Sequence, residues 1–113
     1  MTEEMKESRR QPIKTTRVTI HGTDDKPSDY EGWWFTARTN APIGAYRDVA
    51  SGSFDLIING LSKIIVKSWN FVDEEGKDLP PPSEETVAGL ALDLALASAQ
   101  AYMEEVNKLP PNS

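Results

Sequence analysis

The sequence predicts an α+β domain, with a small antiparallel sheet packed against about three helices. β-Branched and aromatic residues gather in two short runs, near residues 17–21 and 31–38, as is typical of strands. Apolar residues recur at helical spacing in three further segments. These segments, including a long C-terminal helix, lie near residues 43–50, 54–65 and 84–107.

The two ends of the chain are predicted to be disordered. Residues 1–14 carry too few apolar side chains to offset the roughly 1–2 kcal/mol per residue that ordering costs. Residues 110–113 follow the last predicted helix, which a pair of prolines ends. A chain of 113 residues suffices for one ordinary domain but not for two. We therefore place a single domain at residues 15–109.

The two strands are predicted from alternation and composition. Near residues 17–21, β-branched residues alternate with polar ones, and a segment rich in turn formers, 22–28, follows them. Residues 30–39 are aromatic and β-favouring, and this run ends before Pro42, which has no N–H to give to a ladder. The simplest arrangement pairs the two strands antiparallel.

The middle of the chain predicts two helices. Pro42 suits the first turn of a helix, which then runs over 43–50. The apolar residues of 54–65 form one stripe of an amphipathic helix. The β-branched run 64–66 leaves the end of this helix open, because residues 65–71 alternate as a strand would.

A charged turn and a stiff connection precede the last helix. Residues 73–78 are acidic, with Gly76 where a turn needs a positive φ, and the three prolines of 79–82 favour an extended chain. Ser83 is suited to cap the next helix, with two glutamates in its first turn. This helix is predicted to run to about Asn107.

Most of the circumference of the predicted 84–107 helix is apolar. Either the core surrounds the helix, or a small domain covers one side of it and leaves an apolar strip exposed. An exposed strip would serve self-association or the binding of a partner protein. The candidate partner-binding residues are Leu90, Leu94 and Ala101 on one flank, and Leu92, Leu96 and Met103 on the other.

The sequence offers no recognisable catalytic or metal-binding chemistry. There is no cysteine, which excludes disulfides and thiolate metal sites. His21 is the only histidine, so neither a histidine metal cluster nor an ordinary catalytic triad can be assembled. The acidic cluster at residues 73–75 lacks the ligand spacing of a calcium loop, and the glycines do not form a phosphate-binding loop. We therefore predict no cofactor, no metal and no catalytic residue.

Charge and hydropathy indicate which classes of partner and which compartment to expect. A formal net charge of -6 opposes phosphate backbones and anionic lipids, so we expect neither nucleic acid nor a membrane as partner. The chain begins without the apolar run of a signal peptide, and nowhere do about 18 apolar residues follow one another. The cytoplasm is thus the expected compartment. Either Trp33 and Phe35, or Trp34, should pack into the core, because adjacent strand residues point to opposite faces.

Three segments of the chain resemble a known family. They are Tyr30-Glu31-Gly32-Trp33-Trp34; Asn40-Ala41-Pro42-Ile43-Gly44 with Arg47-Asp48; and Trp69-Asn70-Phe71-Val72-Asp73-Glu74-Glu75-Gly76-Lys77-Asp78-Leu79-Pro80. Together they resemble the tail assembly chaperone-like proteins encoded among the tail genes of long-tailed bacteriophages. The most specific part is the succession of Trp-Asn-Phe, an acidic turn with glycine, Leu-Pro, a proline-rich segment and a Leu/Ala-rich helix.

The resemblance implies a non-enzymatic role in the host cytoplasm. Such a protein would bind the long tape-measure protein, keep it soluble, help the tail-tube protein assemble around it, and be absent from the mature virion. The alternative is a structural tail or neck component that stays in the virion. A metal-dependent hydrolase is a weaker rival, since no convergent carboxylate motif supports it. The residues expected to anchor the fold are Trp33, Trp69, Asn70, Phe71 and Gly76.

Overall fold

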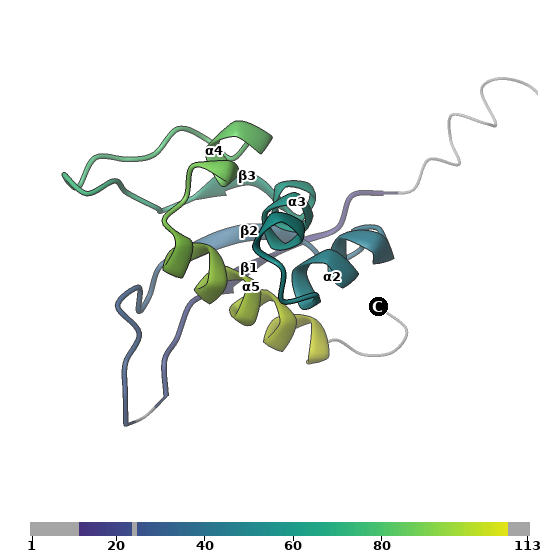
Figure 1. Ribbon diagram of the computed structural model, residues 1–113, viewed down its shortest axis with the longest axis horizontal. Helices are drawn as coiled ribbons and strands as arrows, with labels where there is room; N and C mark the ends of the chain where they lie inside the picture. Colours follow the sequence, from purple (N-terminus) through teal and green to yellow (C-terminus); the bar gives the residue numbers. More distant parts are fainter. Residues whose placement is uncertain (1–11, 24, 109–113) are drawn as a thin grey trace, which may run out of the picture.

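The computed structural model describes residues 12–23 and 25–108 and confirms the α+β class. Strands β1 (Thr15–Thr19), β2 (Trp34–Arg38) and β3 (Ile65–Trp69) form an antiparallel sheet in that order (Figure 1). The described residues also form four helices, α2 (Ile43–Ala50), α3 (Phe54–Ile64), α4 (Glu84–Ala88) and α5 (Leu92–Asn107). Residues 1–11 and 110–113, within the segments predicted to be disordered, lie outside the described residues.

The first two strands lie close to their predicted places, with shifted ends. β1 begins at Thr15, and the backbone N–H of Ile20 extends the pairing beyond β1 by donating to the carbonyl oxygen of Trp33 at 2.7 Å. β2 begins at Trp34 rather than at 31. The reason is a tight turn, in which the N–H of Trp33 donates to the carbonyl oxygen of Tyr30 and Gly32 has a φ of 83°.

A third strand resolves the open end of the helix predicted at 54–65. α3 ends at Ile64, and Ile65 already has the extended conformation, with φ -76° and ψ 123°. β-Branched side chains favour this change, because they restrict rotamers in a helix and pack well in a sheet. The pairing of β3 with β2 shifts register between Phe35 and Ala37, and Lys67 in β3 has a φ of 66°.

The prediction of one continuous helix over 84–107 is wrong, because the chain turns at residues 89–91. Gly89 ends α4 with φ -89° and ψ 1°, and Ala91 precedes α5 with φ -57° and ψ 143°. Glycine costs about 1 kcal/mol relative to alanine inside a helix, which favours a break at this point. The turn lets α4 pack against α3 while α5 packs against α3, α2 and β1. Because α4 and α5 point in different directions, the other elements cover apolar residues that one straight helix would leave exposed.

The predicted cap of the last helical region is present at the start of α4. The Oγ of Ser83 accepts a hydrogen bond from the N–H of Thr86 at 3.2 Å. In return, the Oγ1 of Thr86 accepts one from the N–H of Ser83 at 2.7 Å. This reciprocal pair fixes where the proline-rich segment enters α4.

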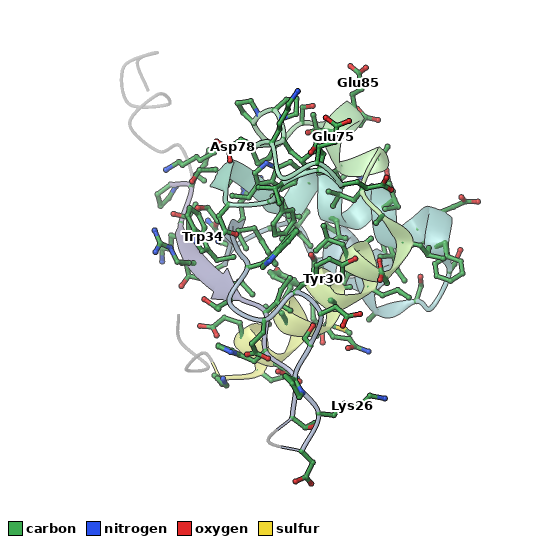
Figure 2. The ribbon with its side chains drawn as sticks, turned by 90° about the vertical axis from the view of Figure 1, so that its left-hand side faces the viewer. Lys26, Tyr30, Trp34, Glu75, Asp78 and Glu85 are labelled. Atoms are coloured by element: carbon green, nitrogen blue, oxygen red, sulfur yellow. The ribbon has the colours of Figure 1, made fainter. Side chains whose placement is uncertain are left out.

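The core lies between the sheet and the helices. Trp33, Phe35 and Ala37 face it, whereas Trp34 lies on the opposite face, where the guanidinium carbon of Arg17 is 4.0 Å from the centre of its ring. Figure 2 shows Trp34 toward the left of the view, beside β1. The buried apolar residues are Val18, Ile20, Phe35, Ala37, Ala45, Val49, Ile57, Leu61, Ile64, Ile65, Phe71, Val87, Leu94, Ala95, Ala99, Ala101 and Tyr102.

Candidate partner-binding cleft

The structure divides the six candidate partner-binding residues between the core and the surface. Leu94 and Ala101 are buried, with 3% and 9% of their surfaces exposed, so their flank of α5 faces the core. Leu90 from the same predicted flank is half-buried in the turn between α4 and α5. On the other flank, Leu92 is 58% exposed, and Leu96 and Met103 are half-buried. An accessible apolar strip therefore runs along α5 from Leu92.

A cleft of about 340 Å³ opens where α4 meets α5, and we call it the junction cleft. Its lining comes from the turn before β2, from the segment after β3, and from the turn between α4 and α5. Figure 1 shows the first two segments extending from the same side of the domain, with the α4–α5 turn between them. The lining residues are Tyr30, Trp33, Val72, Asp73, Glu74, Leu79, Gly89, Leu90, Ala91 and Leu94.

A second hollow, of about 520 Å³, adjoins the junction cleft. The two share Leu79 and Gly89 in their linings, so together they follow the proline-rich segment toward the start of α4. The residues of the second hollow are Leu79, Pro80, Pro81, Ser83, Glu85, Thr86 and Gly89.

Aromatic rings support one wall of the junction cleft. Trp33 meets Tyr30 edge to face, with ring centres 4.9 Å apart, and its ring centre lies 5.8 Å from that of buried Phe71. Trp69 stacks on the other side of Phe71, with centres 4.8 Å apart. Such ring pairs contribute about 0.5–1.5 kcal/mol beyond the burial of their area. Three of the residues expected to anchor the fold thus form one cluster behind the cleft.

The hairpin of residues 71–79 forms the acidic side of the cleft. Its ends are joined by a hydrogen bond from the N–H of Leu79 to the carbonyl oxygen of Phe71, at 3.0 Å. At its tip, one carboxylate oxygen of Asp73 accepts the N–H groups of Glu75 and Lys77, at 2.8 and 3.0 Å. Gly76 has a φ of 84°, the positive value that the turn pattern predicted.

Polar bonds connect this hairpin to the sheet. The side-chain oxygen of Asn70 accepts the N–H of Trp34 at 2.7 Å, and the N–H of Asn70 donates to the carbonyl oxygen of Trp34 at 3.1 Å. The indole N–H of Trp69 donates to the carbonyl oxygen of Pro80 at 3.0 Å. The Trp-Asn pair therefore positions both the hairpin and the proline-rich segment against β2.

Tyr30 connects the turn before β2 to the start of α5. Its hydroxyl donates to a carboxylate oxygen of Asp93 at 2.7 Å, and the N–H of Leu94 donates to the same oxygen at 2.9 Å. The hydrogen bond to Asp93 is the main cause that raises the pKa of Tyr30 to about 12, followed by burial and the negative charge of Asp93. In Figure 2, where this side faces the viewer, Tyr30 lies in front of α5.

Glu31 organises the base of the adjacent loop. Its carboxylate accepts the N–H groups of Gly22 and Ser28, at 2.8 and 3.2 Å, and lies 2.7 Å from Nδ1 of His21. The hydrogen bond from Gly22 and then the one from His21 lower the pKa of Glu31. Neither His21 nor Glu31 lines the junction cleft. The single histidine thus has a local partner that holds the loop.

Carboxylates lie in or beside both hollows. Asp73 and Glu74 line the junction cleft, Glu85 lines the second hollow, and Asp93 is bonded to Tyr30. Among the described residues, the ion pairs are His21 with Glu31 and Lys77 with Glu75, so none involves these four carboxylates. Neither lining contains a lysine, arginine or histidine.

Over residues 12–23 and 25–108, no three or more His, Asp or Glu side chains gather as ligands of a metal ion. None of the helices in these ranges has both the length and the hydropathy to cross a membrane. Comparison of the chain with protein-family models, with curated proteins and with solved structures finds no match.

The sequence alone did not anticipate the junction cleft. It placed Leu90 and Leu94 on one flank of a straight helix, whereas the turn at Gly89 brings them to a concave surface beside Tyr30 and Leu79. One signal was present, because a glycine inside a predicted helix marks a possible break. The pairing of Tyr30 with Asp93 had no local signal, since 63 positions separate the two residues.

Proposed function

We propose that the protein is a non-enzymatic chaperone of bacteriophage tail assembly, which binds the tape-measure protein and assists assembly of the tail tube. One observation carries the proposal. Two of the segments that resemble tail assembly chaperone-like proteins, distant in the sequence, line one cleft. Tyr30 and Trp33 come from the first, and Asp73, Glu74 and Leu79 come from the last.

The shape and lining of the cleft suit protein binding. The core of a protein–protein interface is rich in apolar and aromatic side chains, and its rim is polar. Grooves between helices and loops commonly accept the apolar face of an amphipathic helix. A long tape-measure protein, helical and apolar, offers many such faces. The net charge of -6 would help to keep a complex with an apolar client in solution.

The accessible strip of α5 extends the proposed binding surface. Leu92, at its start, directly follows Ala91, which lines the junction cleft. Leu96 and Met103 continue the strip along the same helix, each partly packed against the core. A client segment longer than the cleft would thus meet further apolar surface on α5.

The test is co-expression with the tape-measure protein encoded nearby, followed by affinity capture. We expect the wild type to retain the tape-measure protein and to raise its soluble fraction. Leu90→Asp in the cleft and Leu92→Asp on the strip should both weaken capture, because each places a charge on the apolar surface. Ile43→Asp is the matched control, since Ile43 is 69% exposed on α2 and lines neither hollow.

Circular dichroism and thermal unfolding would establish that each variant is folded. A folded wild type that neither captures the tape-measure protein nor changes its solubility would contradict the proposal. Its presence at fixed stoichiometry in purified virions would support the structural tail or neck component instead.

A further inference from the structure

We infer that the junction cleft selects client segments in which an apolar side chain is flanked by lysine or arginine. This inference rests on the proposed function and specifies which part of the client the cleft recognises. It follows from two properties of the same surface, an apolar interior and a rim of carboxylates that form no ion pair with the described residues.

The interior accounts for the apolar part of the ligand. Trp33, Leu79 and Leu90 line the cleft and are only partly buried, so some of their apolar surface still faces water. Leu94, which also lines the cleft, is buried, and so is Phe71, whose ring packs against that of Trp33. Burial of apolar area stabilises a complex by about 25 cal/mol per Å², which favours an aliphatic or aromatic side chain here.

The rim accounts for the basic flanks. Asp73 and Glu74 stand on the hairpin side, and Glu85 stands across the second hollow, on α4. All three are exposed, and none forms an ion pair within the described part of the chain. Figure 2 shows Glu85 above Tyr30 in this view. The carboxylates on this rim thus remain available to a cationic partner.

Charge complementarity then decides between client segments of equal hydrophobicity. Basic residues beside the apolar side chain are attracted by the carboxylates of the rim, which raises the affinity of the client segment. Acidic residues there meet like charges, which lowers the affinity and slows association. Each exposed ion pair contributes little, and salt screens it. The selection should therefore be graded and salt-dependent, with several carboxylates acting together.

The experiment measures binding of labelled peptides that tile the tape-measure protein to the full-length chain, by fluorescence anisotropy. We expect the tightest peptides to combine apolar residues with lysine or arginine, and their affinity to fall as salt rises. Glu74→Gln and Glu85→Gln should each weaken them roughly twofold to fivefold and reduce the salt dependence. Glu104→Gln is the matched control, since Glu104 is exposed on α5 and lines neither hollow.

Two results would overturn the inference. One is equal binding of basic and acidic peptides of matched hydrophobicity. The other is a concentration-dependent dimer, seen by sedimentation, that Leu90→Asp abolishes, because a second copy of the chain would then occupy the cleft.

The outcome is separable from that of the proposed function. Capture of the intact tape-measure protein without selection of basic peptides would leave the chaperone proposal standing and reject this inference. Selective binding of basic apolar peptides of any origin, without capture of the tape-measure protein, would support the cleft chemistry and contradict the phage role.

Discussion

The α2–α3 pair and the walls of the junction cleft are stabilised in different ways. The two helices meet at Gly60, where an added Cβ would lie 2.6 Å from the carbonyl oxygen of Ala45 and 2.8 Å from Cγ2 of Val49. The cleft walls rest on aromatic packing and also on hydrogen bonds near the surface, among them those of Asp73 and Tyr30. A packed interface resists any change of volume, whereas a hydrogen bond contributes only about 0.5–1.5 kcal/mol. Mutations should therefore separate the stability of the fold from the shape of the site.

The largest effect is expected for Gly60→Ala. The new Cβ would overlap backbone and force α2 away from α3, which should lower the free energy of unfolding by about 1–3 kcal/mol. Gly44→Ala is the matched control, because nothing lies within 4 Å of a Cβ there and alanine favours the helix by about 1 kcal/mol. Urea unfolding of both variants measures the difference. Equal stability of the two would refute the close contact at Gly60.

The next effect is expected for Asp73→Ala, in the hairpin. Two N–H groups would lose their acceptor. We therefore expect the free energy of opening the hairpin tip, which protects its amides from hydrogen exchange, to fall by about 1–2 kcal/mol. Amide hydrogen exchange at Glu75 and Lys77 should report this loss, while exchange in α3 stays unchanged. Glu74→Ala controls for the loss of an exposed carboxylate nearby. Uniformly faster exchange over the whole domain would show that the hairpin and the core unfold together.

A smaller effect is expected for Tyr30→Phe, which removes one hydrogen bond, at about 0.5–1.5 kcal/mol. Folding raises the pKa of Tyr30 to about 12, so the folded protein keeps the phenol proton that the unfolded chain loses near pH 10. The contribution of Tyr30 is therefore complete below pH 10 and is lost as the pH rises toward 12. The stability difference between wild type and Tyr30→Phe should shrink over that range. A difference independent of pH would argue against the bond to Asp93.

The smallest effect is expected at Glu31, whose carboxylate is exposed. Folding lowers the pKa of Glu31, so its carboxylate stabilises the folded protein at any pH above the pKa that it has in the unfolded chain. This stabilisation is lost as the pH falls through the lower pKa of the folded protein. Glu31→Gln should thus lower the melting temperature slightly at pH 7 and have less effect in acid. Thermal unfolding at pH 7 and in acid measures the melting temperatures. A larger effect of Glu31→Gln in acid would contradict the lowered pKa of Glu31.

The sequence predicted the parts of the fold that depend on local patterns. Alternation and proline located β1 and β2, and the apolar stripe of 54–65 located α3 to within one residue. The break at Gly89 was missed, because the apolar residues around it satisfy a helical pattern on either side. Propensity disfavours a glycine by only about 1 kcal/mol, so tertiary packing decides such a break.

The candidate site was only partly predictable for the same reason. Leu90 was identified from its apolar flank, but its neighbours in the cleft come from segments far away in the chain. The side chains of Asp93 and Asn70 act on Tyr30 and Trp34 across long separations. No periodicity encodes such pairs, because they depend on how the elements pack.

The positive φ of Lys67 has a consequence for the behaviour of the chain at high concentration. β3 is an outer strand of the sheet, and an unpaired outer strand invites pairing with a strand of another molecule. Lys67 interrupts the regular backbone there and adds a charge, both of which disfavour such pairing. A backbone conformation that costs about 1–3 kcal/mol thus disfavours strand pairing through β3.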